Sequence, residues 1–257
     1  MDTATINEKM KTWLLDLGEF IHTSREYKID EKSDFRDLVS EVDIAVENKI
    51  TELIHSLPGT QTILGEETNE DVDVLADHLW VIDPIDGTSN FVKQADDYGI
   101  LVAYFQKGEP ILSYIYEVKT NTLVVAEKGQ GVQLNENLIS APENLALDEA
   151  FFSINPRKMN GTDLMAFVAE NGFDLRFLGS SVSDALRVVE GKYGAFVSPE
   201  SEPWDRAPYR LIAEELGLHM SQFNGEGTTN IGNESFFFGT KQIFEDVFDV
   251  MKNAAFH

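Results

Sequence analysis

Apolar residues recur every three or four positions in two stretches near the start of the chain, residues 6–21 and residues 40–57. This spacing places them on one face of an α-helix, so both stretches are predicted to be helices that bury that face. The second helix is predicted to begin near Ser40 and to end at Pro58-Gly59. The polar stretch between the two helices, residues 24–37, is predicted to be an exposed loop.

From residue 60 onward the pattern changes to short apolar runs bounded by turn residues, which predict buried β-strands. Residues 60–65 and 79–82 are two such runs. Residues 98–134 hold four more, separated by short turn-like segments, and this predicts an antiparallel meander. After Ala150 strands and helices alternate. The strands are predicted at 151–155, 175–178, 193–198 and 236–240, and the helices at 162–171, 181–190, 204–216 and 241–253.

These elements predict an α+β fold in which helices are layered on sheets. The meander belongs to an N-terminal part, residues 1–145, and a mixed sheet belongs to a C-terminal part, residues 146–257. No stretch between the two parts has the composition of a linker. We therefore expect the two parts to form one compact unit.

The amino-acid composition argues against some classes of binding partner and metal site. The 257 residues include 45 Asp and Glu against 20 Lys and Arg, which gives a net charge of −25, and no cysteine. The acidic balance argues against binding nucleic acid or an anionic membrane surface, because Lys and Arg make most contacts to phosphates. The lack of cysteine excludes disulfides and thiolate metal sites. No N-terminal signal segment and no apolar run of ~20 residues is present, so we expect a cytoplasmic protein.

The segment most informative about chemistry runs from Trp80 to Phe91, WVIDPIDGTSNF, where an apolar strand ends in two carboxylates, Asp83 and Asp86. The intervening proline disfavours a helix at Asp83. Both carboxylates and the carbonyl group of Ile85 can therefore lie on one side of a turn. Carboxylate and carbonyl oxygens are the ligands that Mg²⁺ prefers.

Gly87 and Thr88 follow these carboxylates directly. The glycine lets the backbone approach a ligand closely, and the free amides of both residues can bind a phosphate group. Asp-Pro and Asp-Gly are also ordinary turn sequences. The intact string from the apolar strand to Asn-Phe nevertheless favours the functional interpretation.

Three further acidic residues have an ordinary explanation beside a functional one. Glu66 follows a predicted strand and can reach a metal beside the next strand, although taken alone an acidic turn in solvent explains it better. Asp205 lies in the first turn of a predicted helix, where it either complements the helix dipole or presents a metal ligand. Asp43 either forms a capping-box-like pair with Ser40 or hydrogen bonds to Thr88 and activates its hydroxyl toward a water molecule.

In this order and spacing, four segments resemble the inositol monophosphatase family of Mg²⁺-dependent, lithium-sensitive phosphatases. They are Asp37-x-Val-Ser-x-x-Asp43, Gly65-Glu-Glu67, the string from Trp80 to Phe91, and Trp204-Asp-x-Ala207. The resemblance implies an α-β-α-β-α layered fold of the inositol monophosphatase and fructose-1,6-bisphosphatase type. It also implies two or three Mg²⁺ ions, a homodimer, and hydrolysis of a small phosphate monoester by metal-activated water.

The resemblance assigns roles by matching position. The metal ligands it implies are Glu66, Asp83, the Ile85 carbonyl, Asp86 and Asp205. Thr88, supported by Asp43, is implied to orient the water, with Glu66 also in the catalytic set. The groups implied to contact phosphate or substrate are Asp86, Gly87, Thr88 and Ser198.

Ser198 marks a departure from the family pattern. Members specific for inositol carry an acidic residue seven positions before the aspartate that corresponds to Asp205, and here that position is a serine. A hydroxyl contacts a cyclitol ring less strongly than a carboxylate does. The alcohol part of the substrate is therefore left open: inositol monophosphate is the main expectation, with NADP(H) or fructose-1,6-bisphosphate as the alternatives.

Three other interpretations were weighed. Asp71-Val-Asp73-Val fits the motif of phosphatases that form an aspartyl phosphate, but no buried strand precedes it, so we interpret it as solvated. Gly129-Gln-Gly131 is a weak signal for a nucleotide-binding oxidoreductase and is predicted to be a hairpin turn. A non-catalytic, metal-binding regulatory protein is the remote alternative, although Thr88 and every ligand position are retained.

Overall fold

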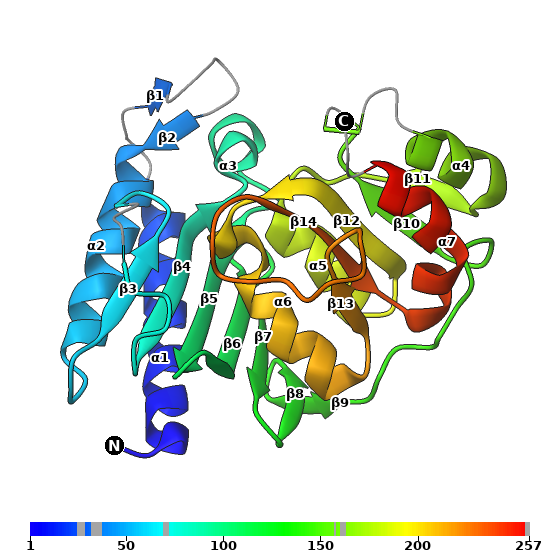
Figure 1. Ribbon diagram of the computed structural model, residues 1–257. Helices are drawn as coiled ribbons and strands as arrows, with labels where there is room; N and C mark the ends of the chain where they lie inside the picture. The colour runs from blue at the N-terminus through cyan, green and yellow to red at the C-terminus, as the bar shows by residue number, and fades with distance from the viewer. Residues whose placement is uncertain (25–28, 32–37, 69–71, 157, 160–162, 255–257) are drawn as a thin grey trace.

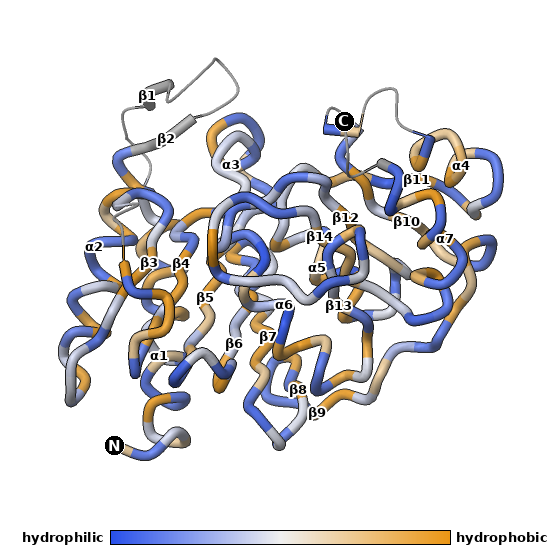
Figure 2. Tube along the Cα trace, viewed as in Figure 1, coloured by the Kyte–Doolittle hydropathy of each residue, from blue (hydrophilic) through white to orange (hydrophobic). Residues whose placement is uncertain are grey.

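The computed structural model describes residues 1–24, 29–31, 38–68, 72–156, 158–159 and 163–254 (Figure 1). The two larger sheets and three groups of helices alternate as layers, with a buried apolar cluster on each side of each of these sheets. The predicted α+β layered fold is therefore confirmed. Figure 2 shows apolar residues running along the central strands, as buried layers require.

The first helical layer consists of α1 (Thr3–Thr23) and α2 (Glu41–His55), as the helical spacing predicted. The side chain of Asp2 caps α1 by accepting from the amide of Thr5 at 2.8 Å. The apolar faces of both helices pack against one face of the larger sheet. This layer matters for function because α2 also buries two carboxylates, Asp43 and Glu47.

The larger sheet has seven strands in the order β3-β4-β5-β6-β7-β8-β9. β3 and β4 are parallel and all other pairs are antiparallel, which confirms the predicted meander. Trp80 on β4 faces the α1–α2 layer, whereas Val81 faces the opposite layer, so every residue of β4 is buried. The strands are β3 (Thr62–Gly65), β4 (Leu79–Asp86), β5 (Gly99–Gln106), β6 (Glu109–Glu117), β7 (Thr122–Glu127), β8 (Gly131–Leu134) and β9 (Asn137–Ile139).

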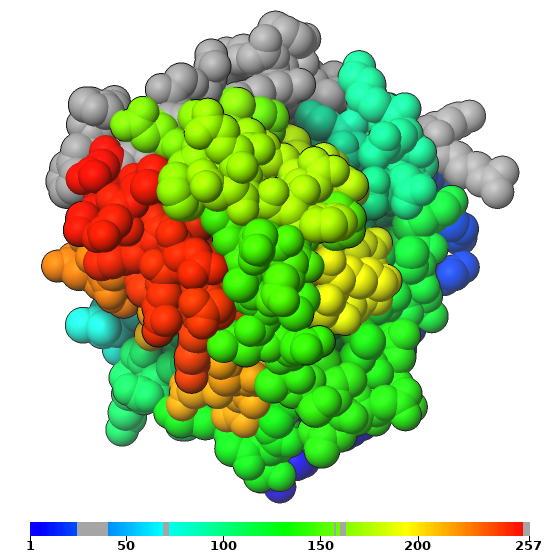
Figure 3. All heavy atoms as spheres, turned by 90° about the vertical axis from the view of Figure 1, so that its right-hand side faces the viewer, coloured from blue at the N-terminus to red at the C-terminus, as the bar shows by residue number. Residues whose placement is uncertain are grey.

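The second sheet has five strands in the order β11-β10-β12-β14-β13. α5 (Ser181–Val189) and α6 (Pro203–Leu216) lie between the two sheets, and α6 contacts strands of both. α4 (Asp163–Asn171) and α7 (Lys241–Ala254) cover the outer face, which Figure 3 views directly. The strands are β10 (Phe151–Ile154), β11 (Asp174–Arg176), β12 (Tyr193–Ser201), β13 (His219–Ser221) and β14 (Glu234–Gly239).

Some elements differ from the expectation. β1 (Ile29–Glu31), inside the stretch predicted as a loop, pairs with β2 (Leu38–Ser40), which directly follows that stretch, and the residues between the two strands lie outside the described part of the chain. Where a turn was expected after residue 82, β4 continues to Asp86 and α3 (Thr88–Gln94) follows. The short strands β9 and β13 were not predicted. Within the described residues, no helix combines the length and apolar character that crossing a bilayer requires.

Candidate active site and metal centre

Three carboxylates from distant parts of the sequence meet between the two sheets. Asp83 and Asp86 lie at the end of β4, and Asp205 lies in the first turn of α6. One oxygen of each lies within 4.8 Å of the others. A register shift between β4 and β5 separates Asp83 from Asp86, and it allows both side chains to reach the same point. Trp204 packs against apolar residues of β4 and β5, which fixes the start of α6 beside them.

Burial makes this cluster electrostatically unfavourable without a cation. Asp83 is 2% exposed, and burial raises its pKa well above its usual range. The charges of neighbouring carboxylates, that of Glu66 first, raise the pKa of Asp83 further. Burial, followed by the charge of Asp86, raises the pKa of Asp205 to about 6. In the described part of the chain, Asp83 Oδ1 is buried without a hydrogen-bond partner. Hard oxygen donors with an unsatisfied atom fit a divalent cation.

Glu66 lies next to this cluster, at the first position after β3. Its amide donates to the carbonyl oxygen of Ile82 on β4 at 3.2 Å, which continues the pairing of the two strands. The charge of its carboxyl group is the largest contribution from a neighbouring carboxylate to the raised pKa of Asp83. The structure therefore brings Glu66 to the same cluster from a separate strand.

The Thr88 hydroxyl is shared between two acceptors. It lies 2.9 Å from Asp43 Oδ1 and 3.0 Å from the carbonyl oxygen of Ile85. Asp43 is fully buried in the first turn of α2, so this contact joins α2 to the start of α3. Of the two interpretations of Asp43, the hydrogen bond to Thr88 is present, whereas the side chain of Ser40 lies outside the described residues.

Position 87, between β4 and α3, has room for glycine only. Its φ of 82° lies in the left-handed region, and a Cβ atom would lie 2.9 Å from both the Asp97 carbonyl oxygen and Ser180 Cβ. The N-terminus of α5 therefore lies directly against this loop. The Ser180 hydroxyl donates to Asp86 Oδ2, and the amide of Val182 donates to the same oxygen at 2.7 Å.

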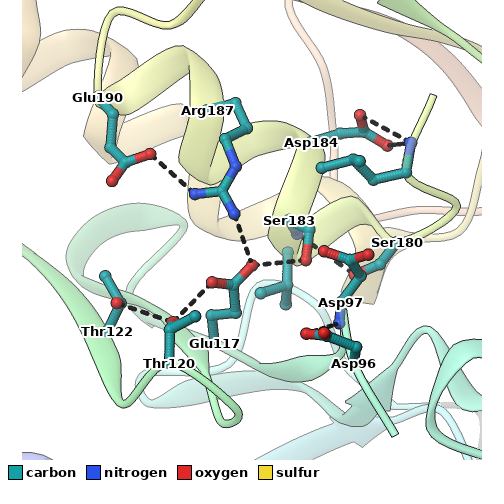
Figure 4. Close-up of polar contacts among 12 residues, drawn as sticks. Asp96, Asp97, Glu117, Thr120, Thr122, Ser180, Ser183, Asp184, Arg187 and Glu190 are labelled. Carbon is teal, nitrogen blue, oxygen red and sulfur yellow. Dashed lines mark hydrogen bonds and ion pairs between the residues drawn. The ribbon is translucent and has the colours of Figure 1, made fainter. Parts of the chain in front are cut away.

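A polar network around the buried carboxylate of Glu117 holds α5 in this position. Figure 4 shows Ser183, Arg187 and Thr120 converging on the carboxylate of Glu117, which lies at the end of β6. Ser183 Oγ donates to Glu117 at 2.7 Å, and Arg187 lies 3.4 Å from the same oxygen. Sequence reasoning did not include Ser180 or this network. The one signal for them was the helix-start sequence Ser180-Ser181.

A cavity of about 170 Å³ opens beside Asp86 and Asp205. Ser198 lines it, and its hydroxyl donates to the carbonyl oxygen of Glu200 at 2.6 Å. Lys158 Nζ donates to the same carbonyl at 2.7 Å. Among the described residues that line the cavity, Lys158 is the single cation. The apolar part of the wall is formed by Phe177, Phe196 and Phe236.

Two alternative motifs lie away from this site. Asp73 is exposed, and its carboxylate accepts from the amide of Leu75 at 3.0 Å within a local turn, while Asp71 lies outside the described residues. Gly129 and Gly131 form the hairpin between β7 and β8, and their amides donate to the carboxylate of Glu215. Of the described residues in these segments, none belongs to the carboxylate cluster.

Comparison with known proteins now decides the family. A model of the inositol monophosphatase family matches residues 6–247. The chain belongs to the inositol monophosphatase family. The resemblance stated from the four sequence segments is thereby confirmed.

Individual members are similar over almost the whole chain. The fructose-1,6-bisphosphatase/inositol-1-monophosphatase of Thermotoga maritima is 30% identical, over 90% of this chain and 89% of its own. The structure of an IMPase/NADP phosphatase complexed with Mg²⁺ and phosphate matches with a TM-score of 0.92 and 31% identity, over 96% of this chain and 95% of the other. Staphylococcal inositol monophosphatase-1 in an inhibitory complex with LiCl matches with a TM-score of 0.93 and 31% identity, over 97% and 95% of the two chains.

Membership in this family confirms the reaction class predicted from the sequence, a hydrolase of phosphate monoesters that uses a divalent cation. The oligomeric state, the cellular location and the roles of individual residues stay predictions.

Proposed function

We propose that this protein hydrolyses a small phosphate monoester with water, using cations held by Asp83, Asp86 and Asp205. The observation that carries the proposal is the convergence of these three carboxylates, two buried and one half-buried, within 4.8 Å at the side of a cavity. Glu66 and the carbonyl of Ile85 complete the proposed ligand set. Two or three bound Mg²⁺ ions would neutralise the ester, lower the pKa of a water molecule and stabilise the leaving oxygen.

The protein groups would orient the attacking water. Because Thr88 donates its own proton toward Asp43, the Thr88 oxygen is left free to accept a hydrogen bond from a water molecule. Glu66, which lies near Asp83, would provide a second acceptor for this water. The amides of Gly87 and Thr88 would donate to the phosphate oxygens, since both lie next to Asp86. No covalent intermediate on the protein is required.

We also propose a homodimer in the cytoplasm. The dimer rests on the family resemblance. The location rests on the phosphate esters for which the relatives are named, which are metabolites of the cell interior. Inhibition by Li⁺ is proposed as well, because the three carboxylates that would hold the weakest-bound cation are all present.

Removal of divalent cations tests the reaction class. Excess chelator should abolish phosphate release from inositol-1-phosphate, and added Mg²⁺ should restore it, because the cluster otherwise repels an anionic ester. Ca²⁺ should inhibit, since its ligand distances of about 2.4 Å are longer than those of Mg²⁺ and would misplace the water. Full turnover in chelator, measured as inorganic phosphate, would contradict the proposal.

Lys158 favours a second candidate function, hydrolysis of an ester whose alcohol part carries another negative charge. Inositol-specific members have an acid at the position of Ser198, whereas this cavity offers a hydroxyl there and an ammonium group close by. Both side chains contact the same carbonyl oxygen of Glu200, so they lie together at the wall of the cavity. Fructose-1,6-bisphosphate and NADP are substrates of this kind.

Lys158→Met should lower kcat/KM for these doubly charged esters about tenfold or more, since a hydrogen bond to a charged group contributes about 1.5–3 kcal/mol. For inositol-1-phosphate the change should stay within about threefold, because its ring carries no second charge. Lys158→Arg should retain the preference. Lys128→Met, which removes one positive charge at the exposed ion pair with Glu109, is the matched control. Equal losses on both kinds of substrate would remove Lys158 from substrate selection.

A further inference from the structure

α2 buries two carboxylates one helical turn apart, and the proposed function uses only one of them. Asp43 and Glu47 are 0% and 1% exposed, and their four-residue spacing places them on the same face of the helix. Asp43 contacts Thr88. Glu47 reaches the turn that follows β3, and this turn carries the metal-site residue Glu66.

Glu47 holds that loop through both of its oxygens. Its Oε2 accepts from the amide of Glu67 and its Oε1 accepts from the amide of Thr68, each at 2.8 Å. In the described part of the chain, Glu47 has no ion pair with a lysine or arginine. A buried carboxylate is costly unless it is hydrogen-bonded, so these two amides are what stabilise its charge. The loop conformation and the Glu47 carboxylate therefore depend on each other.

The residues on either side of Glu66 show how closely this arrangement is fitted. A Cβ atom on Gly65 would lie 2.6 Å from the carboxyl carbon of Glu47, so only glycine leaves room for the carboxylate. On the opposite side, the amide of Glu66 donates a hydrogen bond to the carbonyl oxygen of Ile82 on β4. The backbone of Glu66 is thus fixed between β4 and α2. Its side chain lies near Asp83, whose pKa it raises.

We propose that Glu47 is a positioning residue for the metal centre, which fixes the Gly65–Thr68 turn so that Glu66 is presented beside Asp83. The inference rests on the proposed function of Glu66 as a cation ligand. If Glu47 only stabilised the fold, its substitution would lower the fraction of folded protein. The Mg²⁺ affinity of the molecules that remain folded would not change.

A double-mutant cycle on Mg²⁺ binding separates these roles. The dissociation constant of Mg²⁺ is measured calorimetrically for the full chain, together with the Mg²⁺ dependence of phosphate release. Glu47→Gln keeps the shape of the side chain but removes one acceptor oxygen and the charge. It should weaken Mg²⁺ binding about 10- to 100-fold, the usual effect of losing a group that orients a metal ligand. Glu52→Gln, at an exposed position on the same helix, is the matched control and should leave the constant unchanged.

The decisive comparison is with Glu66→Gln. If Glu47 acts through Glu66, the double variant should bind Mg²⁺ no more weakly than Glu66→Gln alone. Losses that multiply would overturn the proposal, and so would an unchanged Mg²⁺ constant in a folded Glu47→Gln protein. Gly65→Ala provides an independent route if Glu47→Gln does not fold, because its methyl group would displace the Glu47 carboxylate and should weaken Mg²⁺ binding in the same direction.

The outcome is distinguishable from failure of the proposed function. A wild-type protein that binds Mg²⁺ but releases no phosphate would contradict the phosphatase activity and leave the Glu47–Glu66 coupling intact. An active wild type whose Mg²⁺ affinity does not respond to Glu47→Gln would contradict the coupling alone.

Discussion

Asp83→Asn should abolish most phosphate release and, at the same time, make the cation-free protein more stable. The activity loss should be about 10³-fold or more, because a bound cation supplies several kcal/mol of charge stabilisation and each 1.4 kcal/mol is a factor of ten. Asp83 is the most buried carboxylate of the cluster, so no neighbouring water can replace it as a ligand. Initial rates with excess Mg²⁺ measure this loss.

The stability gain has a defined pH dependence. A carboxyl whose pKa is raised on folding binds more protons in the native state, so the free energy of unfolding falls as pH rises through the window between the two pKa values. For Asp205 this window runs from 3.8 to about 6, and for Asp83 it begins at 3.8 and extends well above that value. Without cation, the wild type is therefore least stable above this window. Asp83→Asn, which removes one of the repelling charges, should raise Tm by about 2–6 °C at pH 8 and by almost nothing at about pH 3.5, below the window.

Thermal unfolding in chelator at the two pH values checks this prediction. Asp73→Asn is the control, because Asp73 is exposed and serves only a local turn. It should change neither activity nor the pH dependence of Tm by more than experimental error. A fully active Asp83→Asn protein, or one destabilised equally at both pH values, would show that Asp83 is not part of a cation site.

Thr88→Ala should lower kcat by about 10²- to 10³-fold while leaving Mg²⁺ binding close to that of the wild type. The hydroxyl is proposed to orient the water, and losing a group that stabilises the transition state costs about 2.7–4 kcal/mol. Thr88→Ser keeps the hydroxyl, so it should retain activity within a few fold. Asp43→Asn should fall between these two variants, because the amide can still contact the Thr88 hydroxyl but carries no charge.

Single-turnover and steady-state rates with saturating Mg²⁺ distinguish these outcomes. If Thr88→Ala and Thr88→Ser lose activity equally, then the methyl group and its packing matter rather than the hydroxyl. If Thr88→Ala raises only KM, Thr88 contributes to ground-state binding of the phosphate and the water must be oriented by another group.

The chemistry of the site was predictable because its residues are concentrated in one short string. Asp83, Ile85, Asp86 and Thr88 lie within six positions, so their relation is local and can be argued from backbone geometry. The predicted end of β4, at residue 82, was wrong because the same short string combines apolar and polar residues. Polar residues at the end of an apolar run were interpreted as a turn, whereas here they are buried within the strand. Polar residues are usually exposed, but a site that buries carboxylates places them inside the protein.

Glu47, Ser180 and Lys158 were missed because their contacts depend on tertiary packing. Glu47 occupies one polar position in an amphipathic helix, and nothing in that pattern shows that it faces a loop 20 residues away. Ser180 approaches Asp86 across 94 positions of sequence. Contacts of this kind follow from how α2 and α5 pack against the sheets, which periodicity alone does not determine.

The placement of the site between the two sheets gives the enzyme a division of labour. Glu66, Asp83, Asp86 and Thr88, which would carry out the hydrolysis, come from the first sheet and its connections, whereas most of the cavity wall, including Lys158, comes from the second. Apart from Asp205, which α6 contributes, most residues proposed for catalysis and most residues of the cavity wall therefore lie in separate stretches of the sequence. A change in one stretch can redirect the enzyme to a new metabolite without rebuilding the other. Relatives at about the same sequence distance, named for inositol phosphate, fructose bisphosphate and NADP, are the diversity that such modularity permits.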